Sequence, residues 1–150
     1  MGLRRKAREM ALQTLYAMDF KEKDGEFGEL ELLNQYEEIL SEIASADDIT
    51  SEDQRYSFAD DLVRRTIQHL SEIDAVITKH TKNWSLERLA SIDRNILRLA
   101  VSEMFYSDTP APIIINEAIE IAKRFSTEQS GKFVNGILDK IQSEHTKHGS

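Results

Sequence analysis

Apolar residues recur at steps of three and four along most of the chain, the spacing that places them on one face of a helix. The first such stripe covers residues 3–18 and comprises Leu3, Ala7, Met10, Ala11, Leu15 and Met18. Similar stripes follow Gly28, run on from Ser51, and fill most of residues 92–141. No segment alternates apolar and polar residues as a strand would, and the chain contains only two prolines. The sequence therefore predicts an all-α protein.

Turn and capping residues divide this pattern into about seven helices. Gly25 and Gly28 separate the first helix from the second, and the segment "ASADDITSED" separates the second from the third. Ser51 is the predicted N-cap of the third helix, and Ser71 is expected to cap a fourth near residues 72–80.

Later breaks complete this division. The segment "SDTPAP" stops a strong helix that ends near Phe105, because each proline lacks an amide donor and restrains the residue before it. Ser126 with Gln129 predicts a capping box for the last helix, "SGKFVNGILDKIQ". We expect the end of the chain, residues 145–150, to be a flexible tail.

Length and composition narrow the class of protein. A chain of 150 residues with 40% hydrophobic content is long enough for one domain with a continuous core. It contains no cysteine, which excludes disulfides, cysteine zinc sites, iron–sulfur clusters and thiol nucleophiles. No run approaches the roughly 18 apolar residues of a membrane span, and no apolar segment follows the basic N-terminus as in a secretory signal. We therefore expect a cytoplasmic protein.

The formal net charge of −8 is unevenly distributed along the chain. Residues 1–20 carry a net charge of +2, residues 21–61 carry −11, and residues 62–150 carry +1. The acidity thus belongs to one segment. The first helix and the C-terminal half remain able to bind a polyanion such as nucleic acid.

The first helix concentrates four cationic residues, Arg4, Arg5, Lys6 and Arg8, near its N-terminus. Cations at this end oppose the helix dipole by roughly 0.3 to 1 kcal/mol each at low salt, so some other interaction should favour them. Guanidinium groups bind phosphates bidentately, and an aromatic ring nearby stacks an unpaired base for about 1 to 3 kcal/mol. Tyr16 shares a flank of the helix with Arg5 at 100° per residue. The alternative is that the arginines pair with the acidic second helix, and composition alone does not decide between the two.

The last helix holds a second candidate surface. Four apolar residues suffice for its core stripe, which leaves Phe133 beside Lys132 as a second stacking surface. Gly136 lies in mid-helix, where glycine costs about 0.5 to 1 kcal/mol relative to alanine. Close approach of another backbone, from a neighbouring helix or from a ligand, would explain this glycine, and helix packing is the commoner of the two.

Catalytic motifs are absent from the sequence. The segment "SGKF" lacks the glycine that a P-loop needs five residues before Gly131, and Phe133 replaces its serine or threonine. The four histidines form no zinc motif, and the paired acids lack the spacing of a calcium loop. We therefore expect no enzymatic activity, no metal and no cofactor.

Four segments resemble the NusB family of bacterial transcription antitermination factors in their order and spacing. They are "RRKAREMALQTLYAMDF", "IDRNILRLAVSEM", "INEAIEIAKRF" and "KFVNGILDKI". This resemblance implies one NusB-like domain over residues 1–144, built of two small helical bundles at about residues 1–80 and 81–144. It also implies pairing with NusE, a small-subunit ribosomal protein, to bind the single-stranded boxA element of nascent RNA. With other Nus factors on RNA polymerase, such a complex suppresses termination in ribosomal RNA operons.

The resemblance also implies which residues do this. The RNA-binding residues would be Arg4, Arg5, Lys6, Arg8, Gln13 and Tyr16 of the first helix and Lys132 and Phe133 of the last. The contacts with NusE would correspond to Glu87 and Asp93. Asp93 stands where many relatives have glutamate, so its reach is shorter. Gln129 occupies a position that is often acidic in the family, so it should repel phosphate less.

Two other interpretations remain. Some ribosomal RNA cytosine methyltransferases resemble NusB at their N-termini, but this chain ends at Ser150 without a glycine-rich methyl-donor fold. The other is a helical protein–protein adaptor or a homodimer, in which the basic helix meets an acidic surface such as residues 21–61 and is masked from RNA. The sequence does not distinguish a monomer from a dimer.

Overall fold

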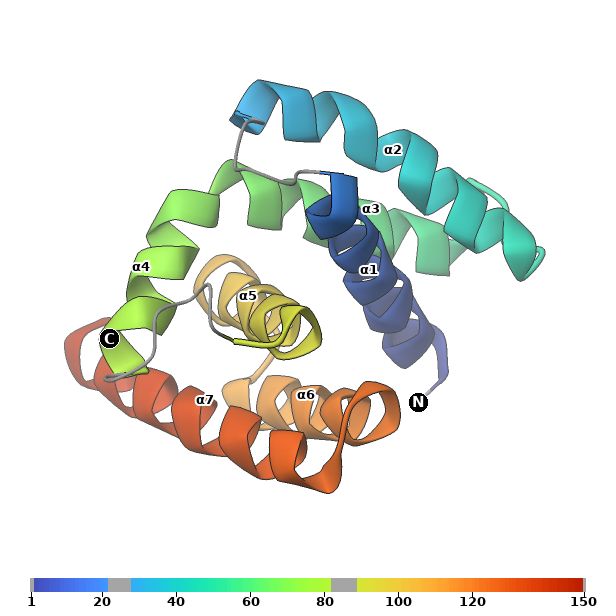
Figure 1. Cartoon of the computed structure of the whole chain (residues 1–150). Helices are drawn as coiled ribbons and strands as arrows, with labels where there is room; N and C mark the ends of the chain where they lie inside the picture. The colour runs from blue at the N-terminus through green and yellow to red at the C-terminus, as the bar shows by residue number, and fades with distance from the viewer. Residues whose placement is uncertain (1, 22–27, 82–88, 150) are drawn as a thin grey trace. The chain divides into compact units, whose positions relative to one another are not determined.

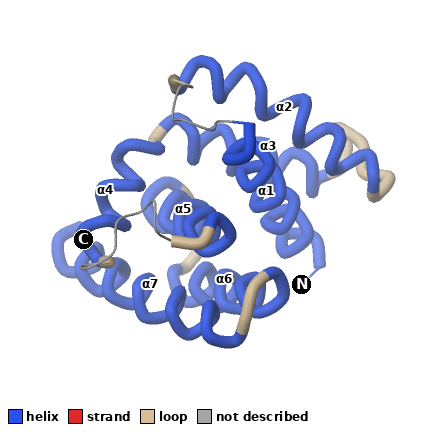
Figure 2. The backbone as a smooth tube through the Cα atoms, in the orientation of Figure 1, coloured by secondary structure: helices blue, strands red, loops and turns tan. Residues whose placement is uncertain are grey.

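The computed structural model describes residues 2–21, 28–81 and 89–149, and all regular structure in these ranges is α-helical (Figure 1, Figure 2). The helices are α1 (Gly2–Lys21), α2 (Glu29–Ala46), α3 (Gln54–Gln68), α4 (Leu70–His80), α5 (Ser91–Tyr106), α6 (Ala111–Phe125) and α7 (Glu128–Gly149). The prediction of an all-α protein with about seven helices is thus confirmed for these ranges. The chain forms two compact units, residues 1–68 and 69–150.

In the first unit, α1, α2 and α3 each contact the other two. The predicted stripe of α1 is buried except at Leu3, which lies in the first turn and is 56% exposed. The largest fully buried side chains of this unit are Met10, Leu12, Tyr36, Leu40, Leu62 and Ile67. Since α1 commits one face to this core, its basic residues lie on a helix whose position is fixed by packing.

In the second unit, α5 contacts α4, α6 and α7, and α6 packs along α7 (Figure 1). The largest fully buried side chains are Ile73, Ile77, Leu97, Ile114, Leu138 and Ile141, drawn from all four helices. Fully burying one such side chain contributes about 1.5–3 kcal/mol. The remaining face of α7 is therefore presented from a firmly packed helix.

A buried tyrosine links α2 to α3. The Tyr36 side chain is almost fully buried, and its hydroxyl donates to Asp60 Oδ1 at 2.8 Å and accepts from Arg64 Nε at 3.1 Å. Arg64 also forms an ion pair with Asp60. Burial and the hydrogen bond to Asp60 raise the pKa of Tyr36 to about 12. Part of the charge in the acidic segment therefore serves the fold.

Three helix starts differ from the predicted ones. The helix α4 begins at Leu70 with His69 at its N-cap position, so Ser71 lies inside the helix and does not cap it. Asp53, not Ser51, caps α3, because its Oδ1 accepts a hydrogen bond at 2.8 Å from the backbone N–H two residues later. Thr127, not Ser126, caps α7, because its Oγ1 accepts from the backbone N–H of Ser130 at 3.0 Å. Aspartate and threonine are both favoured caps, and apolar periodicity does not decide which of several adjacent capping residues leaves the helix.

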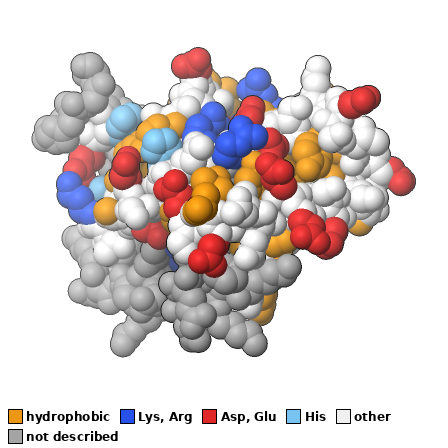
Figure 3. Space-filling view, turned by 90° about the horizontal axis from the view of Figure 1, so that it is seen from above, with side chains coloured by type: hydrophobic (Ala, Val, Ile, Leu, Met, Phe, Trp, Pro, Cys, Tyr) orange, Lys and Arg blue, Asp and Glu red, His pale blue; other side chains and the backbone are white. Residues whose placement is uncertain are grey.

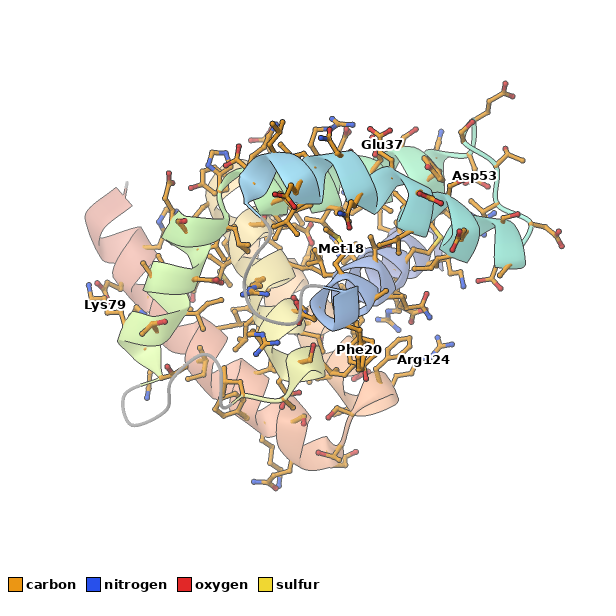
Figure 4. The ribbon with its side chains drawn as sticks, turned by 45° about the horizontal axis from the view of Figure 1, so that its top comes forward. Met18, Phe20, Glu37, Asp53, Lys79 and Arg124 are labelled. Atoms are coloured by element: carbon orange, nitrogen blue, oxygen red, sulfur yellow. The ribbon has the colours of Figure 1, made fainter. Side chains whose placement is uncertain are left out.

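The last helix is longer than predicted. Glu144 accepts a hydrogen bond from Lys79 of α4, and its Oε2 lies 2.7 Å from His80 Nε2. Lys79 is labelled in Figure 4. The ring of His145 stacks on Phe105 of α5 with 4.3 Å between centroids. These contacts with α4 and α5 support the later turns of α7, while flexibility at the end of the chain stays a prediction.

Candidate nucleic-acid interface

The four cationic side chains of α1 differ in exposure. Arg4 is exposed, Arg5 and Lys6 are half-buried, and Arg8 is only 6% exposed. Helical phase explains part of this pattern, since Arg4 and Arg8 border the apolar stripe. The four predicted RNA-binding cations are therefore not equally accessible to a ligand.

An aromatic ring on α3 receives two of these cations. The guanidinium carbons of Arg4 and Arg8 lie 5.3 and 5.2 Å from the centroid of the Phe58 ring. A cation–π contact contributes about 0.5–1 kcal/mol at an exposed site and about 2 or more when desolvated. Arg8 thus supports the fold of the first unit, whereas Arg4 is ordered by the ring and still exposed. The apolar spacing that runs on from Ser51 would place Phe58 in the core of the first unit, but its side chain is only half-buried.

Lys6 is paired with the acidic segment. Its Nζ donates to Asp47 Oδ2 at 2.6 Å, next to the C-terminal end of α2. The contact holds the pKa of the Asp47 carboxyl below its usual range. Pairing with the acidic segment, the alternative considered for the arginines, therefore occurs at Lys6. Both side chains are partly exposed, so salt screens the pair.

A pair of aromatic rings follows the cations along α1. Tyr16 is half-buried, and its ring meets the ring of Phe20 edge-on, with 4.9 Å between centroids. Phe20 is 62% exposed and projects from the last turns of α1 (Figure 4). Gln13, one turn earlier, is also exposed. Phe20 is absent from the predicted site, although its position four residues after Tyr16 is the spacing at which helical side chains meet.

The second candidate surface lies on α7. Lys132 is exposed and Phe133 is half-buried. Gly131 precedes them at the contact with α6, where an added Cβ would lie 3.2 Å from Lys123 Cγ. At Gly136, by contrast, an added Cβ would meet no atom of the described residues within 4 Å. Among the described residues, Gly131 is therefore the glycine of α7 that packs closely against a neighbouring helix, and none packs against Gly136.

Asp93 faces the start of α7. Its Oδ2 accepts a hydrogen bond from Ser130 Oγ at 3.2 Å, and Ser130 Oγ lies 2.8 Å from Ser126 Oγ. Its Oδ1 is buried and has no hydrogen-bond partner within the described ranges. Burial raises the pKa of Asp93, and the hydrogen bonds from Ser130 and Ser126 partly offset this effect. Asp93 therefore links α5 to the first turn of α7. Its partner there, Ser130, lies two residues before Lys132.

Asp93→Asn should stabilise the protein more at neutral pH than in acid. A carboxyl whose native pKa is raised above 3.8 binds its proton more readily in the folded state, so its ionisation opposes folding as pH rises through that native value. Asparagine carries no charge at either pH. Urea unfolding of both proteins at pH 7 and pH 4 measures this difference. A constant difference between the two pH values would contradict a destabilising Asp93 charge.

The other predicted partner residue, Glu87, lies outside the described residues. The predicted cations and aromatic residues of α1 belong to the first unit, whereas Lys132, Phe133 and Asp93 belong to the second. Each surface is therefore defined within its own unit.

The remaining surface gives no sign of a metal site. Within residues 2–21, 28–81 and 89–149, no three acidic or histidine side chains gather in a way that could hold an ion. Seen from the side of α2, acidic side chains are spread over the surface, with basic ones among them (Figure 3). In the part of the chain that the structure describes, no helix is both long and apolar enough to span a membrane.

The sequence has close relatives. The model of the NusB family matches residues 5–143. The transcription antitermination protein NusB of Geobacter sulfurreducens is 47% identical over 144 residues, which cover 95% of this chain and 96% of that protein. The NusB protein of Solibacter usitatus is 43% identical over 144 residues, or 96% of this chain and 91% of that protein.

Solved structures agree with these matches. T. maritima NusB superimposes with a TM-score of 0.79 at 39% identity, over 95% of this chain and 92% of that one. A chain in the crystal structure of the antitermination factors NusB and NusE in complex with dsRNA gives a TM-score of 0.78 at 32% identity. That match covers 96% of this chain and 98% of the other.

Proposed function

Because this chain belongs to the NusB family of transcription antitermination proteins, we propose that its α1 surface binds boxA-type single-stranded RNA in nascent transcripts together with NusE. In this proposal the protein is a cytoplasmic adaptor without enzymatic activity. Joined with other Nus factors on RNA polymerase, it supports transcription of ribosomal RNA operons.

The observation that carries this proposal is the arrangement of exposed groups along α1. The Arg4 guanidinium is exposed beside Phe58, and the Tyr16 and Phe20 rings follow toward the other end of the helix. Arg5 and Tyr16 share a flank and are about 16 Å apart along the axis at 1.5 Å per residue. Phosphate contacts at one end and stacked bases at the other suit a single strand, because its bases are unpaired.

The burial of the apolar face of α1 favours a single-stranded ligand over a duplex that is read in its groove. A helix that reads duplex DNA enters the major groove, whereas α1 buries its apolar face against α2 and α3. The related NusB and NusE factors were crystallised in complex with double-stranded RNA. The experiment below therefore compares single-stranded with double-stranded RNA.

The proposed contacts with NusE involve Glu87 and Asp93. Asp93 is half-buried in the first turn of α5, so a partner protein would contact the exposed part of its side chain. Its bond to Ser130 would then connect the partner contact to the start of α7.

Fluorescence anisotropy tests the proposal. A labelled single-stranded boxA RNA, the same RNA annealed to its complement, and a scrambled single strand are titrated with the protein alone and then with NusE. We expect the boxA single strand to bind most tightly and to bind more tightly when NusE is present. Equal binding to all three RNAs that disappears in salt and ignores NusE would instead indicate a generic charged surface. That result would favour the hypothesis of a protein–protein adaptor or a homodimer.

A further inference from the structure

The turn that ends α2 holds Asp47 in place. The backbone N–H of Asp47 donates to the carbonyl oxygen of Ala44 at 3.1 Å, and that of Ile49 donates to the same oxygen at 2.9 Å. Ile49 is buried. Asp48, between them, has a φ of 57°, in the left-handed region that aspartate adopts more readily than most residues. The Asp47 carboxylate is therefore presented to α1 by a turn whose backbone is fixed.

Both members of the Lys6–Asp47 ion pair lie at the unfavourable end of their own helix. Lys6 lies near the N-terminus of α1, where the helix dipole repels cations, and Asp47 follows the C-terminus of α2, where the dipole repels anions. The last turn of α2 contains no basic residue that would offset the charge of Asp47. The contact of 2.6 Å between Lys6 Nζ and Asp47 Oδ2 brings the two charges together, so each offsets the cost of the other.

A phosphate and the Asp47 carboxylate would use the same ammonium group. Lys6 is one of the proposed RNA-binding cations, and Asp47 accepts one of its three N–H donors. While the pair is closed, the Lys6 side chain is only 30% exposed. A phosphate close to Lys6 would also lie close to the carboxylate, and the two anions repel each other. The ion pair must therefore open before Lys6 can make a close phosphate contact.

We infer that Asp47 competes with RNA phosphate for Lys6 and thereby lowers the affinity of the protein for RNA. In this arrangement the closed ion pair is the state of the free protein, and a bound strand takes the place of Asp47 on the ammonium group. The inference rests on the proposed RNA-binding function. It adds to the α1 surface a residue that opposes RNA binding from within the same chain.

The geometry lets the ion pair compete and still open. Because the turn keeps the carboxylate near Lys6, RNA competes with an intramolecular anion of high effective concentration. The two side chains are 30% and 48% exposed, and such exposed ion pairs are weak. The pKa of Asp47 is lowered by the hydrogen bond from Lys6 and also by the charge of Arg55. A displaced Asp47 therefore remains in water and still faces a cation.

Asp47→Asn should strengthen boxA RNA binding about threefold, because a partly exposed ion pair no longer has to be broken. Asp48→Asn is the matched control. It removes the same charge from the neighbouring exposed residue, and asparagine also adopts a positive φ readily. The control should change the affinity by less than about twofold, since water and salt screen a charge that does not touch the binding group.

Lys6→Ala, alone and combined with either aspartate substitution, tests whether Asp47 acts through Lys6. Lys6→Ala alone should reduce the slope of log K against log salt by about 0.7, the value for one phosphate contact on a single strand. Once Lys6 is absent, Asp47→Asn should strengthen RNA binding no more than Asp48→Asn does, because there is no ion pair left to break.

Anisotropy titrations with labelled boxA RNA and with a scrambled strand, at several salt concentrations, are combined with a melting curve for each variant. A larger gain in Asp47→Asn than in Asp48→Asn, which disappears without Lys6, supports the inference. Equal gains in the two variants would show a general charge effect and overturn it. A difference that persists without Lys6, a salt slope that Lys6→Ala leaves unchanged, or a change confined to the melting temperature also overturns it.

Failure of the proposed function gives a different result. In that case the unmodified protein binds boxA RNA and the scrambled strand equally. The same comparison of aspartate variants on the scrambled strand then still shows whether Asp47 competes with phosphate for Lys6.

Discussion

Replacing Arg4 and Arg5 together with alanine should lower the affinity for boxA RNA about 25-fold at 0.1 M salt. Each phosphate contact on a single strand contributes about 0.7 to the slope of log K against log salt. Two lost contacts therefore remove about 1.4 from the slope, which amounts to about 25-fold between 1 M and 0.1 M salt. Anisotropy titrations at several salt concentrations give both the affinity and the slope.

The control for this double variant is Arg55→Ala combined with Lys79→Ala. It removes the same charge from residues that already pair with Asp53 and Glu144 on other helices or loops. This control should keep the slope of the unmodified protein. If both double variants lose affinity equally, the effect is one of net charge, and α1 is not the phosphate site.

Arg8→Ala should destabilise the protein by about 2 kcal/mol, a far larger effect than Arg4→Ala. Both guanidinium groups lie over the Phe58 ring, but Arg8 is 6% exposed and Arg4 is exposed. A desolvated cation–π contact contributes about 2 kcal/mol or more, and an exposed one about 0.5–1. For a chain of this size the melting temperature should fall by about 4–8 °C.

Urea unfolding of the two single variants measures this difference, and their RNA affinities are compared at a temperature where both are folded. Arg4→Ala is the matched control, because it removes the same group from the same ring. Equal unfolding free energies for the two variants would show that burial of Arg8 does not contribute to the fold. A loss of RNA affinity in a fully folded Arg8→Ala variant would show that Arg8 also contributes to RNA binding.

The apolar pattern was sufficient to predict the helices, because apolar residues at steps of three and four form one buried face on each helix. Met10 and Leu138 are examples of such buried residues. The residues that cap the helices were harder to predict. Asp53 and Thr127 each stand beside other capping residues, and only the path of the chain decides which one is used. The length of α7 depends on contacts of Glu144 with α4, which are remote in sequence and leave no periodic signal.

Residue type indicated the candidate site on α1, but the exposure of its side chains was not predictable from the sequence. Four adjacent cations on α1 suggest a common role, yet Lys6 pairs with Asp47 and Arg8 is buried beside Phe58. Both partners lie about 40 residues or more away in the chain, so local spacing could not identify them. At Gly136 the sequence indicates a cost in helix stability, and the described residues supply no close neighbour that would explain it.

The Phe58 ring has a consequence for the entropy of binding. A flexible arginine loses rotamer freedom when it grips a phosphate, and each immobilised side chain costs about 0.5–1.5 kcal/mol on association. Arg4 already lies over Phe58 in the free protein, so part of this ordering takes place during folding rather than during RNA capture. In the proposed complex with RNA, the neutral Phe58 ring would thus raise affinity by preorganising Arg4.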